Sequence, residues 1–349
     1  MREIVIVIRD LYLEPELVAP AAVDAAALEV APGVEQLARF GDKAALPEGW
    51  RAWTAHWLGL PQYAAAAPAT VAAAALEGAP ADGAVWLATP VHLIAGMTSV
   101  HFDRRSVLRL QDAELEALAA SFRDTFQGSG FDLRPLGNGE LLLTGPEVSP
   151  AGTTTEPARL LLTSVAEALP TGAGTRALRQ LSAEIEMWLH DHPVNDERGR
   201  RGALTVATLW LWGGGASAAF PAAAAAREIM DAAFGSDAYL RGLWRLAGGE
   251  TRPMPVDWAT VISEPRVRRA LGVAEVAELL HANASWRLAD AVADIDRRLI
   301  SPSLAALHRG ELDRLFLLAN DRLLSLRPAN RWRLWRHMRS TRSALEGLA

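Results

Sequence analysis

The fold class is decided by the stretch EIVIVIRD, which spans residues 3–10. Its β-branched run from Ile4 to Ile8 is typical of a parallel strand that is buried on both faces. Arg9 and Asp10 follow at the carboxyl end of this strand. Open α/β sheets place their binding sites at that end. The stretch therefore predicts a buried parallel sheet, with Arg9 and Asp10 as the first candidate site residues.

Other strands and helices are predicted on either side of this strand. Helices are expected at 32–40, 50–60, 111–126, 175–190 and 275–300, strands at 84–95, 205–212 and 312–319, and a hairpin from 131–135 and 140–144. The pattern predicts an α/β fold with a central, mostly parallel sheet flanked by helices. The strand–helix–hairpin order predicts a small inserted α+β domain at 85–204, with the core formed by 1–84 and 205–349.

Composition excludes several classes of protein. The chain has 349 residues, 50% of them hydrophobic, which excludes disorder over most of the length. It has no cysteine, so disulfides, thiolate nucleophiles and thiolate-bound metals are excluded. Its apolar runs are too short for a transmembrane segment or a signal peptide. We therefore expect a cytoplasmic protein, and the net charge of −6 argues against a general polyanion binder.

Three segments together resemble the archaeal-type, cofactor-independent phosphoglycerate mutases. They are HPVN at 192–195 followed by LWLWGGG at 209–215, the strand that leads into Asp10, and TAHWLG at 54–59. In those mutases an HPVN stretch likewise precedes a strand that ends in a glycine-rich turn. The resemblance implies an alkaline-phosphatase-like core carrying an inserted domain.

Three further stretches resemble a bacterial family described either as such mutases or as RpfE-type regulatory proteins. They are LATPVHL at 87–93, WLHDHPVN at 188–195 and WRLWR at 332–336. This resemblance implies a regulatory role and does not specify a molecular activity.

The mutase resemblance implies two divalent metal ions, manganese or zinc, beside a serine nucleophile. Asp10 occupies the first ligand position, and Glu14 lies near the second acidic one. The serine–aspartate pair of the family falls on Ala52 and Trp53, which can neither attack phosphorus nor bind a metal. Thr54 supplies a hydroxyl only with a shifted register.

The later ligand positions are equally changed. The late aspartate–histidine pair of the family falls on Asp321 and Arg322, and the Asp-x-x-Gly-His segment falls on LHANA at 280–284. Asp10 and Asp321 are therefore interpreted as remnants of a metal site, and no tightly held metal pair is expected. The residues left to bind a small anionic ligand are Arg9, Asp10, Glu14, Thr54, His56, Asp321 and Arg322.

Three functions remain as hypotheses. The leading one is a catalytically degenerate, regulatory or ligand-binding protein that needs no cofactor, with a small anion or another protein as partner. The second is an active mutase or phosphotransferase that uses manganese or zinc. The third is binding to a nucleic acid or a membrane surface through the arginine-rich C-terminus, although we do not expect nucleic acid as the partner.

The C-terminal stretch 327–342 contains six arginines, two tryptophans and no acid. Read as a helix, it places Trp332, Trp335 and Met338 on one stripe. We expect this helix to be docked on the body through that stripe, because exposed indole rings would form an apolar patch. Contact with a nucleic acid or an anionic lipid is the alternative.

Overall fold

The computed structural model describes most of the chain. The described residues are 1–13, 31–78, 82–96, 100–101, 103–137, 139–146, 154–160, 165–168, 175–217, 231–333, 335–337 and 340–346. They fall into two compact units. Unit 1 is formed by Met1–Ala64, Ala225–Ser236 and Gly248–Ala349, and unit 2 by Ala65–Ala224 and Asp237–Ala247.

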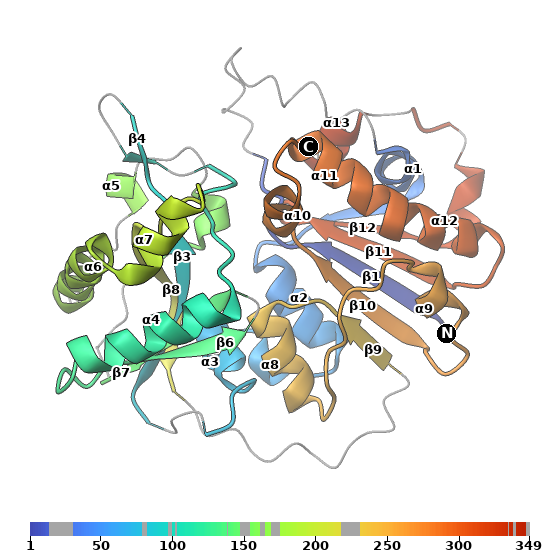
Figure 1. Ribbon diagram of the computed structural model, residues 1–349. Helices are drawn as coiled ribbons and strands as arrows, with labels where there is room; N and C mark the ends of the chain where they lie inside the picture. The colour runs from blue at the N-terminus through green and yellow to red at the C-terminus, as the bar shows by residue number, and fades with distance from the viewer. Residues whose placement is uncertain are drawn as a thin grey trace. The chain divides into compact units, whose positions relative to one another are not determined.

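Unit 1 is built on a six-stranded sheet with the strand order β2-β12-β11-β1-β10-β9 (Figure 1). Its strands are β1 (Glu3–Ile8), β2 (Asp42–Ala45), β9 (Asp231–Phe234), β10 (Arg269–Ala274), β11 (Arg314–Ala319) and β12 (Arg322–Leu326). The four neighbours β11, β1, β10 and β9 are parallel, whereas β12 pairs antiparallel with both β11 and β2. The predicted α/β class with a mostly parallel central sheet is confirmed.

Strand β1 lies inside this sheet because its apolar residues can be buried on both faces. Val5 is paired with Leu271 of β10 on one side and with Phe316 of β11 on the other. Every residue of β1 is buried. The parallel neighbours bring the carboxyl ends of β1, β10 and β11 to one edge, called here the carboxyl edge.

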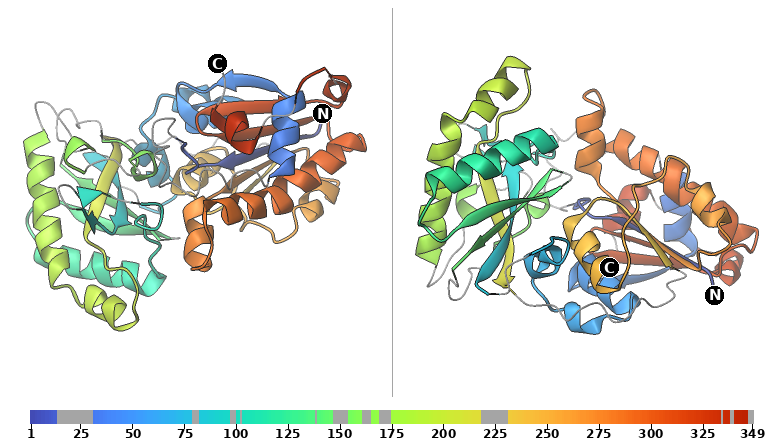
Figure 2. Two further views of the ribbon diagram at one scale, coloured as in Figure 1. Left: turned by 90° about the horizontal axis from the view of Figure 1, so that it is seen from above. Right: turned by 60° about the horizontal axis from the view of Figure 1, so that its bottom comes forward.

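Helices cover both faces of the unit 1 sheet (Figures 1 and 2). Ile4, Ile6 and Ile8 face a core shared with α1, α11 and α12. On the other face, the ring of Trp53 in α2 packs edge-on against Phe316 of β11, with 5.2 Å between ring centroids. The helices of unit 1 are α1 (Pro32–Phe40), α2 (Gly49–Trp57), η2 (Pro61–Tyr63), α9 (Ala259–Ser263), α10 (Val276–Ala282), α11 (Leu288–Ile295), the π-helix η4 (Asp296–Ile300), α12 (Ser301–His308), η5 (Pro328–Trp332) and α13 (Thr341–Glu346).

Unit 2 is an α+β unit with an antiparallel sheet of order β6-β7-β3-β8 and a two-stranded β4-β5 ribbon. Leu141 and Leu143 face α4 and α6 on one side, and Leu142 faces a second core that includes residues of α3. The strands are β3 (Ala84–Val91), β4 (Ile94–Ala95), β5 (Val100–His101), β6 (Asp132–Gly137), β7 (Glu140–Gly145) and β8 (Thr208–Ala216). The helices are α3 (Pro68–Ala73), α4 (Asp112–Thr125), η3 (Pro157–Arg159), α5 (Val165–Ala168), α6 (Thr175–His190), α7 (Pro193–Arg200) and α8 (Ala238–Leu246).

The compact units do not have the boundaries expected at 85 and 204. Strand β8 pairs along most of its length with β3, and this pairing assigns residues 208–216 to unit 2. The glycines at 213–215 are part of β8, which continues beyond the strand end expected at residue 212. A Cβ atom at Gly214 would overlap the indole of Trp86, which explains a glycine inside this strand.

The C-terminal stretch is not the single helix that was predicted. The helix η5 ends at Trp332 and α13 begins at Thr341, and the residues described between them are not helical. Trp332 and Trp335 are 66% and 74% exposed. The expectation that these two rings pack on the body is therefore wrong, and Met338 lies outside the described residues.

Among the described residues, none of the helices combines the length and the apolar character that crossing a bilayer requires.

Candidate functional site

Asp10 lies at the carboxyl end of β1, where the sequence placed the first candidate site residues. Its Oδ1 accepts the N–H of Val276 at 2.7 Å, and its Oδ2 accepts the N–H of Ala277 at 2.7 Å. These N–H groups open α10 and have no partner inside the helix. Asp10 therefore caps the helix that follows the neighbouring strand β10.

The environment of Asp10 also changes its acidity. Burial raises the pKa of Asp10 to about 6, and the charge of Glu275 adds to the rise, while the two N–H groups and Arg9 oppose it. A carboxyl group with a pKa near 6 exchanges its proton close to neutral pH, as a general acid or base requires. Phosphoryl transfer also needs a nucleophile and a cation, so the surrounding residues decide what Asp10 can do.

Arg9 points its guanidinium at an internal partner. Its Nη2 is paired with Oε1 of Glu275, and the two side chains are 8% and 6% exposed. Glu275 is the N-cap residue of α10, so this pair fixes the same corner that Asp10 holds. An anionic ligand would have to compete with a buried carboxylate for this guanidinium.

The turn between β11 and β12 completes the carboxyl edge. Asn320 and Asp321 have φ angles of 51° and 54°, which is the pattern of a two-residue type I′ hairpin. The N–H of Asn320 donates to Leu11 O at 2.9 Å, and its Oδ1 accepts the N–H of Leu13 at 2.8 Å. The carbonyl of Asp321 accepts the N–H of Leu46. The turn therefore ties the segments that follow β1 and β2 to the edge of the sheet.

Arg322 stands where the resemblance implies a metal-binding histidine. It is half-buried in β12 and is paired with Ala45 of β2. Its Nε is buried without a hydrogen-bond partner among the described residues. Glu14, the other residue expected near this edge, lies outside the described residues.

Helix α2 carries the positions where the family has its nucleophile. Ala52 is buried, and Trp53 packs on Phe316. The Oγ1 of Thr54 donates to the carbonyl of Trp50 at 2.7 Å inside the helix, and Thr54 is fully buried. A nucleophile for phosphoryl transfer needs a base that takes its proton, whereas this proton is donated to a main-chain carbonyl.

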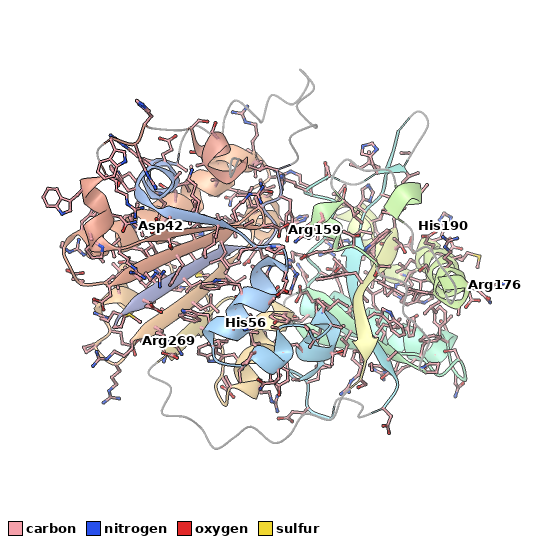
Figure 3. All side chains as sticks on the ribbon, turned by 180° about the vertical axis from the view of Figure 1, so that it is seen from behind. Asp42, His56, Arg159, Arg176, His190 and Arg269 are labelled. Carbon is pink, nitrogen blue, oxygen red and sulfur yellow. The ribbon has the colours of Figure 1, made fainter. Side chains whose placement is uncertain are left out.

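His56 is exposed near the end of α2 (Figure 3). The next residue, Trp57, donates its Nε1–H to Oε2 of Glu3 at 3.1 Å. Glu3 opens β1, and Asp10 follows its end, so roughly 20 Å of strand separates the two. The structure therefore brings Arg9, Asp10 and Asp321 to one edge and leaves His56 near the other.

The residues present do not fit the metal pair that the resemblance implies. Among the described residues there is no group of three or more His, Asp or Glu side chains placed to share a metal ion. Asp10 already accepts two backbone N–H groups, and alanine, tryptophan and arginine stand at other positions where the resemblance implies nucleophile or ligand residues. A cationic guanidinium at residue 322 would repel a divalent metal rather than bind it.

The HPVN segment has a structural role in unit 2. His192 caps α7, with its Nδ1 accepting the N–H of Val194 at 3.1 Å. Asn195 donates to the carbonyls of Leu189 and Val206, each at 2.8 Å, and its Oδ1 accepts the N–H of Val206 at 2.7 Å. Asn195 therefore ties α6 to the segment that leads into β8.

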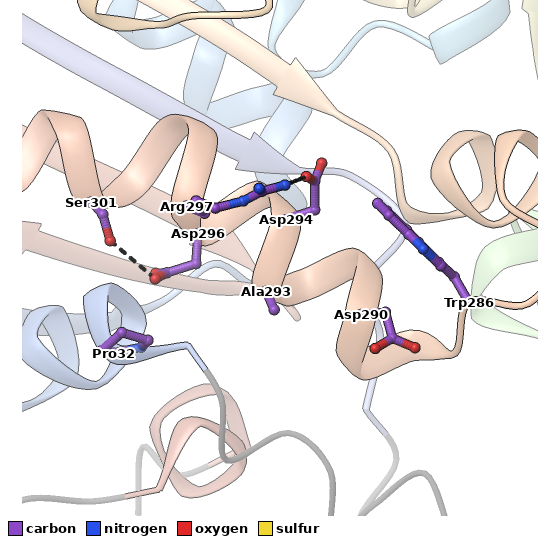
Figure 4. Close-up of a pocket in the computed structure, with 8 residues that line it drawn as sticks. All are labelled: Pro32, Trp286, Asp290, Ala293, Asp294, Asp296, Arg297 and Ser301. Atoms are coloured by element: carbon purple, nitrogen blue, oxygen red, sulfur yellow. Dashed lines mark hydrogen bonds and ion pairs between the residues drawn. The ribbon is translucent and has the colours of Figure 1, made fainter.

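A pocket of about 490 Å³ lies on one face of unit 1, away from the residues that the sequence singled out. It is lined by Pro32, Trp286, Asp290, Ala293, Asp294, Asp296, Arg297 and Ser301 (Figure 4). Asp294 is paired with Arg297 and Arg298. Asp290 accepts the N–H of Arg287 at 2.8 Å. The carboxylates of the pocket are thus engaged in local contacts.

Asp296, at the first residue of the π-helix, repeats the arrangement of Asp10. It accepts the N–H groups of Gly33 at 3.2 Å and Val34 at 3.0 Å, and so caps α1. Burial raises its pKa, while these N–H groups and Ser301 oppose the rise. A Cβ atom at residue 33 would overlap the carboxylate, so this cap requires Gly33.

Sequence reasoning missed Asn320, Glu275 and Asp296 as residues that organise unit 1. The turn at Asn320 could have been predicted, because Asn-Asp between two apolar runs is typical of a type I′ hairpin. Glu275 and Asp296 carried none, because their partners Arg9 and Gly33 are 266 and 263 residues away.

Comparison with solved structures finds two proteins of low sequence identity and low TM-score. A cofactor-independent phosphoglycerate mutase from Thermoplasma acidophilum DSM 1728 is 17% identical to this chain. The alignment covers 99% of this chain and 98% of the mutase chain, with a TM-score of 0.40. A protein from Pyrococcus horikoshii is 13% identical to this chain. The alignment covers 98% of this chain and 92% of the Pyrococcus chain, with a TM-score of 0.47. No family model matches the chain, and no curated protein matches it.

Proposed function

We propose that this chain is a catalytically degenerate, regulatory or ligand-binding protein on a phosphoglycerate-mutase-like scaffold. The sequence resemblance described above supports the scaffold. The observation that supports degeneracy is the state of Asp10, whose two carboxylate oxygens accept the N–H groups of Val276 and Ala277. In this proposal the first ligand position has become a helix cap. The cytoplasmic location remains a prediction.

The contacts around α2 support the same proposal. A phosphoryl acceptor needs a nucleophile whose proton can leave, and the nearest hydroxyl, that of Thr54, is bonded to a main-chain carbonyl in its own helix. Trp53 fills the adjacent position with a ring packed against the sheet. Restoring catalysis would require replacing several residues together, because nucleophile and metal ligands act as a unit.

A small anionic ligand remains the proposed occupant of the carboxyl edge. Arg322 supports this, because its Nε is buried without a partner among the described residues and guanidinium groups bind phosphate in a planar fork. The test is thermal unfolding with 3-phosphoglycerate or inorganic phosphate. We expect both to raise the melting temperature of the wild type and of Arg176→Ala, an exposed control in unit 2, but not of Arg322→Ala. An equal rise in all three proteins would reject Arg322 as a ligand residue.

Mutase activity tests degeneracy directly. Purified chain is incubated with manganese and 3-phosphoglycerate, and 2-phosphoglycerate is followed by phosphorus NMR. We expect no conversion above that of Asp10→Asn, which controls for contaminating mutase. Conversion by the wild type that Asp10→Asn abolishes would establish the alternative, an active metal-dependent mutase.

A further inference from the structure

The C-terminal segment presents a surface that combines exposed indole rings with arginines. We define this Trp–Arg surface by Arg327, Trp332, Arg333, Trp335 and Arg336. Trp332 and Trp335 are 66% and 74% exposed. Arg327 is also exposed, while Arg333 and Arg336 are half-buried. The other ten tryptophans are buried or half-buried, so two rings at this exposure, three residues apart in the sequence, stand out. Exposed apolar patches mark interaction sites.

Polar contacts hold this surface on unit 1. Arg333 donates through Nη1 to Phe40 O at 3.1 Å and to Oδ1 of Asp42 at 2.6 Å, near the start of edge strand β2 (Figure 3). Arg336 donates through Nη1 to Gly41 O at 2.6 Å. Asn330 adds a bond from Nδ2 to Phe40 O at 3.1 Å. These polar contacts hold residues 330, 333 and 336 on unit 1.

We propose that the Trp–Arg surface docks on an anionic lipid surface. Indole rings partition into the interfacial region of a bilayer, where the ring is apolar and the N–H remains hydrated. Exposed arginines of this stretch, such as Arg327, attract anionic headgroups. The stretch 327–342 holds six arginines and no acid, whereas the whole chain has a net charge of −6. The rest of the chain is therefore repelled by the same lipids, so charge alone selects this end for the contact.

The sequence around the two tryptophans favours lipid over a single-stranded nucleic acid as the partner. The stretch WRLWRHM at 332–338 contains the apolar residues Leu334 and Met338 in addition to its tryptophans and basic residues. Leucine and methionine add to insertion into an interface, as in interfacial segments of peripheral proteins. A single-stranded nucleic acid, in contrast, is bound by base stacking on aromatic rings and by cationic contacts to its backbone, in which leucine and methionine have no part.

The test is flotation of the full chain with vesicles of phosphatidylcholine, with and without phosphatidylserine. We expect binding only to the vesicles that contain phosphatidylserine, weakening as salt rises. The double variant Trp332→Ala/Trp335→Ala should bind at least about tenfold more weakly. The matched control is Met187→Ala/Val256→Ala, which removes side chains that are 68% and 86% exposed elsewhere and should bind as the wild type does.

Insertion is tested separately with brominated phosphatidylcholine in the phosphatidylserine vesicles. Tryptophan fluorescence should be quenched in the wild type and not in the double tryptophan variant. Three results would overturn the proposal: no binding to phosphatidylserine vesicles at low salt, equal binding by the double tryptophan variant, or binding without quenching. Loss of binding to oligothymidylate in that variant, with vesicle binding intact, would assign the surface to nucleic acid instead.

Discussion

The carboxylate of Asp10 lies 2.7 Å from the backbone nitrogen of Val276, 266 residues away in the chain. This bond joins the end of the buried strand β1 to the start of α10, and a second bond to Ala277 completes the cap. The position that the resemblance assigns to a metal ligand is thus used to hold two adjacent parts of unit 1 together.

The raised pKa of Asp10 makes stability depend on pH. Its ordinary value is 3.8 and its value in the fold is about 6, so the folded chain holds the proton more tightly than the unfolded chain. The contribution of Asp10 to stability is therefore greatest below pH 4 and is lost as the pH rises to 6. The difference in free energy of unfolding between wild type and Asp10→Asn should fall by up to about 3 kcal/mol between pH 4 and pH 7.

Denaturant titrations of both proteins at several pH values measure this difference. Asp296, whose pKa burial also raises, is present in both proteins, and its contribution cancels. At pH 4 Asp10→Asn should be less stable than the wild type, because an amide can accept only one of the two N–H bonds, at a cost of about 1–3 kcal/mol. This gap should narrow or close as the pH rises to 7. A difference that is constant with pH would show that Asp10 is charged throughout this range.

Two substitutions of the turn residue Asn320 distinguish the cost of backbone strain from the cost of losing its side-chain hydrogen bond. Asn320→Gly keeps the φ of 51° accessible and removes only the bond to Leu13, at a cost of about 1 kcal/mol. Asn320→Ala loses the same bond and also strains the backbone, at about 1 kcal/mol more. Urea unfolding of the two variants gives both values. Equal stability of the two would show that residue 320 carries no backbone strain.

Much of unit 1 could be predicted because its signals are local. The β-branched run of β1 and the amphipathic helices lie within short windows, and the structure has them close to the expected positions. The strands β2, β9, β10 and β12 were missed. Of these, β2 and β9 have only four residues each and lie at the two edges of the sheet. The contacts of Arg9 and Asp10 with α10 could not be predicted, since their partners are more than 250 residues away.

The C-terminal segment shows where a periodicity argument fails. The stripe of Trp332, Trp335 and Met338 predicted a helix docked through its rings, but the main-chain carbonyls of Phe40 and Gly41 offer arginines 333 and 336 an alternative. A charged donor bound to a carbonyl or carboxylate fixes the segment more specifically than an apolar stripe does. The rings consequently remain exposed.

Amide hydrogen exchange can separate these two ways of holding the segment. Arg333→Ala removes the bonds to Phe40 and Asp42, and we expect faster exchange across residues 328–337 by about fivefold or more. Trp332→Ala/Trp335→Ala should leave exchange in the same peptide unchanged. Faster exchange in the tryptophan variant alone would restore docking through the rings.

Asn195 is expected to matter for the stability of unit 2 and not for any chemistry. Asn195→Ala removes three hydrogen bonds and leaves the N–H and the C=O of Val206 without their side-chain partner in the interior, at a cost of about 3 kcal/mol. Exchange of amides in α6 and β8 measures the loss, and amides of β1 in unit 1 are the control. Unchanged exchange in α6 would show that Asn195 does not join the two segments.

Metal content tests catalytic degeneracy most directly. The purified chain is dialysed against manganese and then against metal-free buffer, and bound manganese is measured by elemental analysis, with Asp10→Asn treated in parallel. We expect well below one equivalent in both proteins, since Asp10 is engaged by α10 and Arg322 stands at a ligand position. About two equivalents in the wild type, lost in Asp10→Asn, would contradict the assignment of Asp10 as a helix cap and establish a metal centre.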